Sequence, residues 1–316
     1  MLRATGIRAA YGRSGREILH GVDISLQPGE AVALLGPNGS GKTTLLRVLA
    51  GSLPPLAGTV CLQGEDILRL SPRERARRVA VLSQRSAAPQ GMTALQLVLL
   101  GRYPWLGWWG GYSVGDRRAA CAALEETGAL ALAGRQVSEL SGGELQRVAL
   151  ARILAQQSPV LLLDELAAGL DLARMLELFD LLERRRRAGA ALLLVMHDCN
   201  LAAQYATRLL GLREGRVIFD GPVRRCFTAE RLRALYDVEV RLVAHPANGL
   251  PQALPLRPRG PAYRGEAACG GAAPGGMPPG DATRGGAIRE DIVSEEASRG
   301  DRPRGDRPCG EAARDS

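Results

Sequence analysis

The sequence predicts an α/β protein built around a largely parallel β-sheet. In residues 1–245, short apolar runs rich in valine, leucine and isoleucine alternate with longer helical patterns, as in repeated strand–helix units. The run 31–35 leads through a glycine-rich loop into a helical stretch. The run 160–163 ends in two carboxylates, which places acidic groups at the carboxyl end of a buried strand, where ligands of such sheets bind.

Size and composition fit a globular protein with one large domain or two. The chain has 316 residues, of which 46% are hydrophobic and 23% are charged. Its apolar runs are far shorter than the ~20 residues of a membrane-spanning helix, and its first residues lack the apolar stretch of a secretory signal. The six cysteines have no metal-binding spacing, so we expect reduced thiols. These features predict a cytoplasmic protein whose membrane spans, if needed, come from a partner.

The last part of the chain has a different composition. Residues 246–316 contain 13 glycines and 10 prolines among 71 residues, with 10 basic and 10 acidic side chains. Such a segment buries too little apolar surface to fold alone, so we predict a disordered tail after a domain that spans 1–245. The sequence favours a dispensable extension over a docking segment. The net charge of +8 is therefore carried by residues 1–245. A charge of this size does not by itself distinguish a nucleic-acid, lipid or phosphate ligand.

Local signals predict how the domain is organised. The strand-like runs 18–26 and 30–35 are separated by the turn signal Pro28-Gly29, so we expect antiparallel structure before the parallel core. The stretch Ser71-Pro-Arg-Glu74 has the form of a capping box and predicts the start of a helix. Residues 86–157 carry helical patterns between two core strands, which predicts an inserted helical subdomain.

The glycine-rich loop after the run 31–35 carries the strongest chemical signal. It reads Gly36-Pro37-Asn38-Gly39-Ser40-Gly41-Lys42-Thr43 and fits the pattern G-x-x-x-x-G-K-[ST]. Its glycines let backbone N–H groups surround phosphate oxygens, and the following helix adds the positive end of its dipole. We expect Lys42 to reach the β- and γ-phosphates and Thr43 to ligate Mg²⁺. Lys42 is the only lysine of the chain, and its compact ammonium suits a loop that a planar guanidinium would crowd.

Two adjacent carboxylates follow the run 160–163. Alone, Asp164 and Glu165 are typical of a strand end followed by a helix-capping acid. Together with the phosphate loop, they predict that Asp164 holds Mg²⁺ directly or through water and that Glu165 polarises the attacking water as general base.

A second anion-binding helix terminus is predicted at Leu140-Ser-Gly-Gly-Glu144. Ser141 can cap the helix that runs to about residue 157, and Glu144 completes a capping box. Gly142 and Gly143 leave their N–H groups open to the close approach of an anion.

The phosphate loop and the Leu-Ser-Gly-Gly-Glu motif together resemble those of ATP-binding cassette (ABC) ATPases, over residues 1–242. The resemblance implies a cassette with an antiparallel β subdomain and an inserted helical subdomain, which binds ATP with Mg²⁺ in a homodimer. It further implies that Tyr11 stacks on adenine, Gln84 senses Mg²⁺ and faces the transport partner, and His197 contacts the γ-phosphate. Asp171 matches the aspartate of the dimer-spanning loop, and Ser141 and Gly143 meet ATP bound to the opposite copy.

These expectations assign a residue to each role in the site. The catalytic residues are Glu165, His197 and Gln84, and the metal ligands are Thr43, Gln84 and Asp164. The nucleotide-binding residues are Tyr11, Gly36, Pro37, Asn38, Gly39, Ser40, Gly41, Lys42, Thr43, Thr44, Ser141, Gly142, Gly143 and Asp171. One departure is that Leu166 and Ala167 stand where the family usually has proline and a small hydroxyl residue, which predicts a less rigid loop with hydrolysis retained.

Two further segments resemble the ATPases of importers for iron–siderophore complexes, haem and cobalamin. They are Gly101-Arg-Tyr-Pro-Trp-Leu-Gly107 and Asp198-Cys-Asn-Leu-Ala-Ala-Gln-Tyr-Ala206. Three tryptophans and two tyrosines gather at 103–112, which predicts either a contact surface for a membrane partner or the core of the helical subdomain. The run Arg184–Arg187 is interpreted as a solvated helix C-terminus rather than a nucleic-acid or lipid patch.

The resemblance implies an ATP-hydrolysing importer subunit at the cytoplasmic face of the membrane. Its partners would be membrane-spanning permease subunits, a second copy of itself and, indirectly, a substrate-binding protein, with no nucleic acid. An ATPase for another cargo, such as a free metal ion, and a non-transport ABC ATPase are the alternatives.

Overall fold

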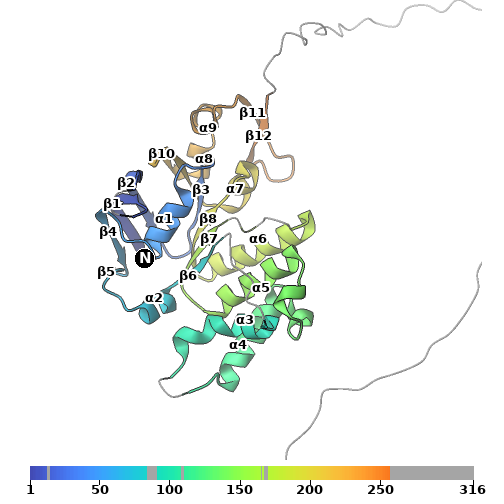
Figure 1. Ribbon diagram of the computed structural model, residues 1–316. Coiled ribbons are helices and arrows are strands. Elements are labelled where there is room, and N and C mark those ends of the chain that lie inside the picture. Colours follow the sequence, from blue (N-terminus) through green and yellow to red (C-terminus); the bar gives the residue numbers. More distant parts are fainter. Residues whose placement is uncertain (13–14, 84–90, 108–109, 165, 167–169, 257–316) are drawn as a thin grey trace, which may run out of the picture. The chain divides into compact units, whose positions relative to one another are not determined.

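The computed structural model describes residues 1–12, 15–83, 91–107, 110–164, 166 and 170–256, and Figure 1 labels its elements. The strands are β1 (Leu2–Ala10), β2 (Glu17–Leu26), β3 (Ala31–Leu35), β4 (Ala57–Leu62), β5 (Glu65–Asp66), β6 (Val79–Leu82), β7 (Val160–Asp164), β8 (Ala191–Val195), β9 (Arg208–Arg213), β10 (Arg216–Pro222), β11 (Val240–Ala244) and β12 (Pro251–Pro255). The α-helices are α1 (Lys42–Leu49), α2 (Pro72–Arg78), α3 (Ala94–Leu99), α4 (Val114–Glu126), α5 (Gly142–Ala155), α6 (Leu172–Arg187), α7 (Cys199–Tyr205), α8 (Val223–Cys226) and α9 (Ala229–Tyr236). Short 3₁₀ helices are η1 (Leu100–Trp105), η2 (Leu130–Leu132) and η3 (Val137–Glu139).

The predicted parallel sheet is confirmed. Its strand order is β10-β9-β3-β8-β7-β6, and every neighbouring pair is parallel except β10 and β9. The strands β3, β7 and β8 are buried along their whole length. This explains their continuous apolar runs, because both faces of a parallel sheet are covered.

Alternate residues of the central strands enter two separate apolar clusters. On β3, Ala33 and Leu35 belong to the cluster that includes α5 and α6, whereas Leu34 belongs to the cluster that includes α1. Strands β7 and β8 divide their residues in the same way, which follows from the two-residue period of a strand. The predicted phosphate loop follows the carboxyl end of β3, and the predicted acidic residue Asp164 is the last residue of β7.

The antiparallel structure predicted before the parallel core is present. A four-stranded sheet, β2-β1-β4-β5, is antiparallel at each pair. The runs 18–26 and 30–35 do not pair, because the Pro28-Gly29 turn carries the chain from this sheet to β3 of the central sheet. Their burial explains the outcome: β2 has buried and accessible residues interspersed, whereas β3 is buried throughout.

A helical region lies in the chain between β6 and β7, which are neighbours in the central sheet. Its helices α3, α4 and α5 pack against one another and appear together in Figure 1. Within the described part of 86–157, the extended structure is a single bridge between Thr93 and Gln136. The capping boxes predicted at Ser71 and Ser141 are both present.

The four arginines Arg184–Arg187 form the last turn of α6, as predicted. Arg185 pairs with Glu126 at 2.6 Å, and Arg186 donates to the Gly29 carbonyl at 2.8 Å. These cations therefore complement the helix dipole and attach the end of α6 to its neighbours.

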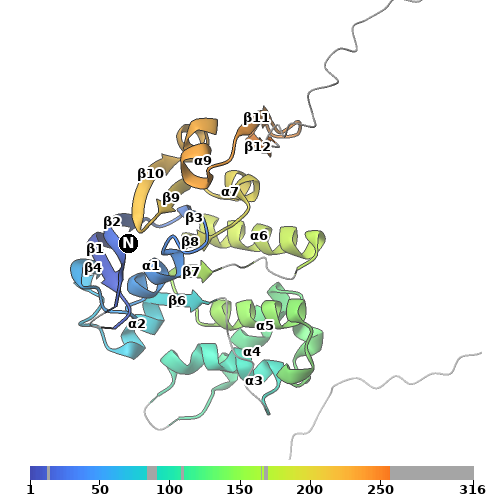
Figure 2. The ribbon, with the colours of Figure 1, turned by 45° about the horizontal axis from the view of Figure 1, so that its top comes forward.

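Regular structure continues past the boundary predicted at residue 245. Strands β11 and β12 form an antiparallel hairpin, drawn near α9 and α7 in Figure 2. Asn200 on α7 fixes this hairpin, because its side-chain amide donates to the Ala253 carbonyl at 3.2 Å and accepts from the Ala253 N–H at 2.7 Å. The structured domain thus reaches further than composition indicated, since Pro251 and Pro255 were counted with a glycine- and proline-rich segment. Residues 257–316 lie outside the described part of the chain.

Among the helices that the structure describes, none combines the length and the apolar character needed to cross a bilayer.

Candidate nucleotide-binding site

The glycine-rich loop folds around the side chain of Lys42. This lysine is the first residue of α1 and is 7% exposed. Its Nζ donates to the Gly36 carbonyl at 2.8 Å and to the Pro37 carbonyl at 3.0 Å. The loop thereby holds an ammonium group at the N-terminus of a helix, where the helix dipole also favours an anion.

Strand β9 and the turn after it support this loop from behind. A Cβ on Gly36 would lie 2.1 Å from the Leu212 carbonyl oxygen, so only glycine allows this approach. Gly215, in the turn between β9 and β10, donates its N–H to the Ser40 carbonyl at 3.0 Å and accepts from the His20 N–H at 2.9 Å. The turn therefore ties the phosphate loop to β2.

Replacing Gly215 with alanine should destabilise the protein by about 2–4 kcal/mol, the range of a strained and overpacked backbone position. Its φ is +71°, and a Cβ there would lie 1.9 Å from the Ile18 carbonyl oxygen. Denaturant unfolding measures the loss. Gly64→Ala is the matched control, because Gly64 has φ +90° but open space around its Cβ, and it should cost only about 1 kcal/mol. Equal losses in the two variants would contradict the role of the close contact.

Oxygen ligands from two distant segments meet beside the loop. Thr43 donates its hydroxyl to a carboxylate oxygen of Asp164 at 3.0 Å, and Asp164 is 2% exposed at the end of β7. A hydroxyl and a carboxylate are hard oxygen donors of the kind that Mg²⁺ prefers when phosphates and waters complete its shell. The pair thus fits the metal predicted from the sequence.

Tyr11 lies just beyond β1 and packs against α1. Its hydroxyl accepts from Thr44 Oγ1 at 3.3 Å and from Arg47 Nη1 at 3.2 Å. The guanidinium carbon of Arg47 lies 5.5 Å from the ring centroid. The residue is nevertheless 42% exposed, so the tyrosine is held in place while part of its surface stays available to a planar ligand.

His197 follows β8 at the same edge of the central sheet. It is exposed and borders a largely apolar cavity of about 270 Å³. The cavity is lined by Leu163, Leu166, Met175, Phe179, Leu194, Val195, Met196, His197, Asp198 and Leu201. The backbone of β7 and that of β8 therefore bring His197 to the region where Asp164 ends its strand.

The second predicted anion site is built as a capped helix terminus. The Ser141 N–H donates to the Glu144 carboxylate at 2.8 Å, and the Glu144 N–H donates to Ser141 Oγ at 3.4 Å. Hydrogen bonds from Ser141, the backbone bond first, lower the pKa of Glu144. Ser141 and Gly142 are exposed, so this helix terminus is accessible to a ligand outside the chain.

The predicted residues fall into separate groups in one copy of the chain. Lys42, Thr43 and Asp164 lie together, whereas Ser141 makes its hydrogen bonds with Glu144 on α5. Asp171 caps α6 and accepts from the Arg174 N–H at 2.8 Å. The predicted residues Gln84 and Glu165 lie outside the described residues, as does Ala167.

The aromatic cluster divides between surface and core. Tyr103 and Trp105 are 63% and 40% exposed, whereas Tyr112 packs against the larger apolar cluster. Trp105 donates Nε1–H to the Gln156 carbonyl at 2.8 Å, and Arg77 of α2 stands 5.2 Å from its ring centroid. The cluster therefore has an exposed part and a part packed in the core, while Trp108 and Trp109 lie outside the described residues.

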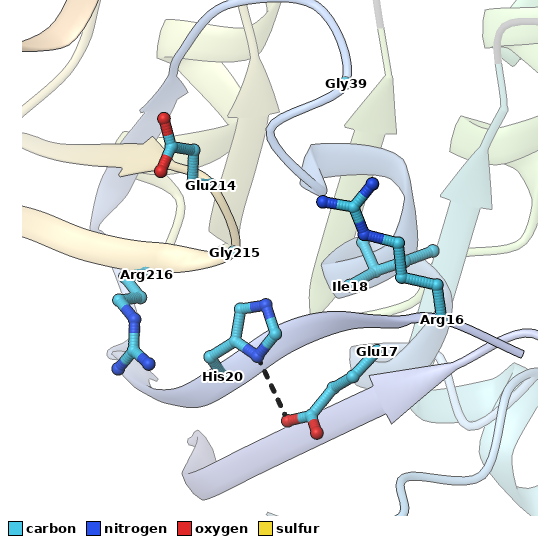
Figure 3. Close-up of a pocket in the computed structure, with 8 residues that line it drawn as sticks. All are labelled: Arg16, Glu17, Ile18, His20, Gly39, Glu214, Gly215 and Arg216. Carbon is cyan, nitrogen blue, oxygen red and sulfur yellow. Dashed lines mark ion pairs between the residues drawn. The ribbon is translucent and has the colours of Figure 1, made fainter.

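A polar cavity beside Gly39 had no sequence signal. Figure 3 shows the cavity, of about 460 Å³, between the start of β2 and the β9–β10 turn. It is lined by Arg16, Glu17, Ile18, His20, Gly39, Glu214, Gly215 and Arg216. His20 pairs with Glu17 at 3.2 Å, and the pKa of Glu17 is lowered to about 2, chiefly by its hydrogen bond with Arg8. The charged residues that line the cavity come from two segments far apart in the chain. In the sequence each segment has the pattern of an ordinary exposed strand, so the cavity could not be predicted from it.

Comparisons with known proteins show which family and which relatives the chain resembles. The profile of the ABC transporter family matches residues 19–168. A hemin import ATP-binding protein of Nocardia farcinica is 43% identical over 259 residues, which cover 81% of this chain and 89% of that protein. The ferric enterobactin transport ATP-binding protein of Escherichia coli is 35% identical, covering 83% and 96%.

Two solved structures share the fold. An inward-facing ABC transporter of the metal-chelate type matches with a TM-score of 0.69 at 25% identity, covering 81% of this chain and 97% of that chain. A dimeric bacterial ABC transporter cassette matches with a TM-score of 0.65 at 27% identity, covering 71% and 99%.

Proposed function

Because this chain belongs to the ABC transporter family, we propose that it is the ATP-hydrolysing subunit of an importer, working with a separate membrane-spanning permease. The chain covers most of the length of relatives named for hemin, ferric enterobactin and iron(3+)-hydroxamate transport. The cargoes in these names are iron-bearing complexes and not bare metal ions. The proposed cargo is therefore a ferric-siderophore or haem, with a cobalamin-type chelate kept from the sequence resemblance, and it contacts the permease rather than this chain.

The observation that carries the proposal is the meeting of Lys42, Thr43 and Asp164 at the end of the central sheet. Lys42 would neutralise the β- and γ-phosphates of ATP, while Thr43 and Asp164 would hold Mg²⁺. The metal would supply charge neutralisation for the phosphates. Tyr11 would stack on the adenine, and Thr44 at the start of α1 would hold the Tyr11 hydroxyl through its hydrogen bond.

The remaining roles complete the reaction. Glu165 would accept a proton from the attacking water, and Gln84 and His197 would orient water, metal and the γ-phosphate. Two copies would face each other, so that Ser141, Gly143 and Asp171 of one copy act on ATP held by the other. The accessible, capped terminus of α5 supports this arrangement, because its contacts within one copy leave Ser141 on the surface.

The permease is proposed to contact the helical subdomain on its aromatic side. Tyr103 and Trp105 are exposed, and arginines of α2 hold their rings in place. Fixed aromatic rings with adjacent cations are typical of protein interfaces. The cassette would then sit on the cytoplasmic face of the membrane through its partner, with a substrate-binding protein delivering cargo on the other face.

Copurification tests this function directly. The tagged full chain, isolated from membranes, should bring down a permease, and its ATPase activity should rise when one cargo with its binding protein is added. Ferric-siderophore, haem, cobalamin and a free metal ion are compared in parallel. Stimulation by the free ion alone would reassign the cargo. A partnerless ATPase that responds to none of them would contradict the importer and favour a non-transport role.

A further inference from the structure

One face of α1 holds the side chain of Tyr11. Thr44 Oγ1 donates to the Tyr11 hydroxyl at 3.3 Å, and Arg47 Nη1 donates to the same oxygen at 3.2 Å. Thr44 and Arg47 are three positions apart in α1 and therefore lie on the same side of the helix. Both bonds end on a single atom, so they fix the outer end of the tyrosine against α1.

Arg47 also contacts the aromatic ring itself. Its guanidinium carbon lies over the ring of Tyr11, 5.5 Å from the centroid, which is within the ~6 Å of a cation–π interaction. Thr44 is buried and bonds the hydroxyl, whereas Arg47 is exposed and holds the tyrosine at the hydroxyl and over one face of the ring. The second face of the ring is then the one available to a planar ligand.

The helix that carries Arg47 also carries the phosphate-binding lysine. Helix α1 begins at Lys42, whose Nζ is bonded to the Gly36 and Pro37 carbonyls. Arg47 follows five residues later, about 7.5 Å along the helix axis. A nucleotide with its phosphates at Lys42 and its base on Tyr11 would therefore have both ends held by groups of one short, rigid helix.

We propose that Arg47 is a positioning residue, which holds the ring of Tyr11 in the orientation that stacks on the base of the nucleotide. This inference rests on the proposed function, in which Tyr11 stacks on adenine. Arg47 does not contact the nucleotide in this scheme and acts through the ring. Without the guanidinium, binding would have to order the ring, and the affinity for the base would fall.

The expected effect is a loss of affinity that depends on the base. Methionine keeps the unbranched stem and the helix preference of arginine but removes the charge and the donor. In Arg47→Met, the Kd for MgATP should rise about three- to tenfold, within the range of cation–π and base-stacking contributions. The Kd for magnesium tripolyphosphate, which has no base, should change by less than about twofold, because Arg47 acts through Tyr11 and not on the phosphates. Isothermal titration calorimetry of the full chain measures both ligands.

The comparison of the two ligands separates positioning from two simpler effects. Damage to α1 would weaken both ligands, because both contact the phosphate loop at the start of this helix. A direct effect of the lost positive charge on the phosphates would also weaken both. Equal losses for MgATP and magnesium tripolyphosphate in Arg47→Met would therefore overturn the positioning role.

A double-mutant cycle tests whether Arg47 acts through the ring. Tyr11→Leu removes the ring, so adding Arg47→Met to this variant should not weaken ATP binding further. Additive losses of affinity in the double variant would contradict the proposal, because they would show that Arg47 acts independently of Tyr11.

Arg231→Met is the matched control. The guanidinium carbon of Arg231 lies 6.0 Å from the centroid of the Phe219 ring, and its Nη1 donates to the Arg225 carbonyl at 3.0 Å. The same exchange thus removes the same kinds of contact at a position outside the nucleotide site, and the Kd for MgATP should stay at the wild-type value. A wild-type chain that binds tripolyphosphate as tightly as ATP would instead contradict the stacking of adenine in the proposed function.

Discussion

Glu165→Gln should reduce ATP hydrolysis by about 10² to 10⁴-fold, the range that a general base contributes. The amide keeps the size of the side chain but cannot accept the proton of the attacking water. ATP binding should survive, because the Gly36 and Pro37 carbonyls hold Lys42 and the Asp164 carboxylate holds Thr43. The variant should therefore accumulate with ATP bound, and a filter-binding assay beside a phosphate-release assay measures the two properties separately.

Glu183→Gln is the matched control for this experiment. Glu183 is a carboxylate on α6 that pairs with Arg186 at 2.7 Å and with Arg187 at 2.8 Å, away from the phosphate loop. Its loss should leave hydrolysis at the wild-type rate. Unimpaired phosphate release in Glu165→Gln would remove this residue from the role of general base.

Lys42→Ala should weaken ATP binding by about 10²-fold, since a charge-assisted bond to phosphate contributes about 1.5–3 kcal/mol and the loop also loses its internal brace. Lys42→Arg should fail to restore binding. The lysine is 7% exposed, and its Nζ already lies 2.8 Å and 3.0 Å from two loop carbonyls. A bulkier planar guanidinium would have to displace that backbone. Titration with a fluorescent ATP analogue measures both variants.

An exchange between arginine and lysine at a position outside the phosphate loop is the control for Lys42→Arg. Arg184→Lys, in the last turn of α6, exchanges the same two side chains at a helix end and should leave the affinity for the analogue unchanged. Wild-type affinity in Lys42→Arg would show that the loop tolerates any cation and would contradict the steric argument.

The sequence predicted those parts of the fold whose signals are local. The strand before Gly36, the capping boxes at Ser71 and Ser141 and the strand that ends at Asp164 each follow from a few neighbouring residues, and all are present. The antiparallel structure before the parallel core was predicted, but the partner strand of β2 was not, because a turn at Pro28-Gly29 cannot show which sheet receives the next strand. The β11–β12 hairpin was missed because its anchor, Asn200, lies about 50 residues away from β12.

The candidate site also contains contacts that the sequence could predict and contacts that it could not. The contact between Thr43 and Asp164 could be predicted across 121 residues, because each residue type follows a strand of one parallel sheet. The support of Ser40 by Gly215 and the bond from Arg47 to Tyr11 could not, since they depend on how turns and helices pack. Those contacts involve residues whose identities alone do not specify a partner.

The single lysine of this chain has a practical consequence for chemical labelling. Acylating reagents that attack amines can find only the terminal amine and the Lys42 Nζ. Because the latter is buried and bonded to the Gly36 and Pro37 carbonyls, acylation there requires the loop to open. A second acyl group, detected by intact-mass spectrometry, is therefore a direct count of molecules whose phosphate loop has opened, in a background without other lysines.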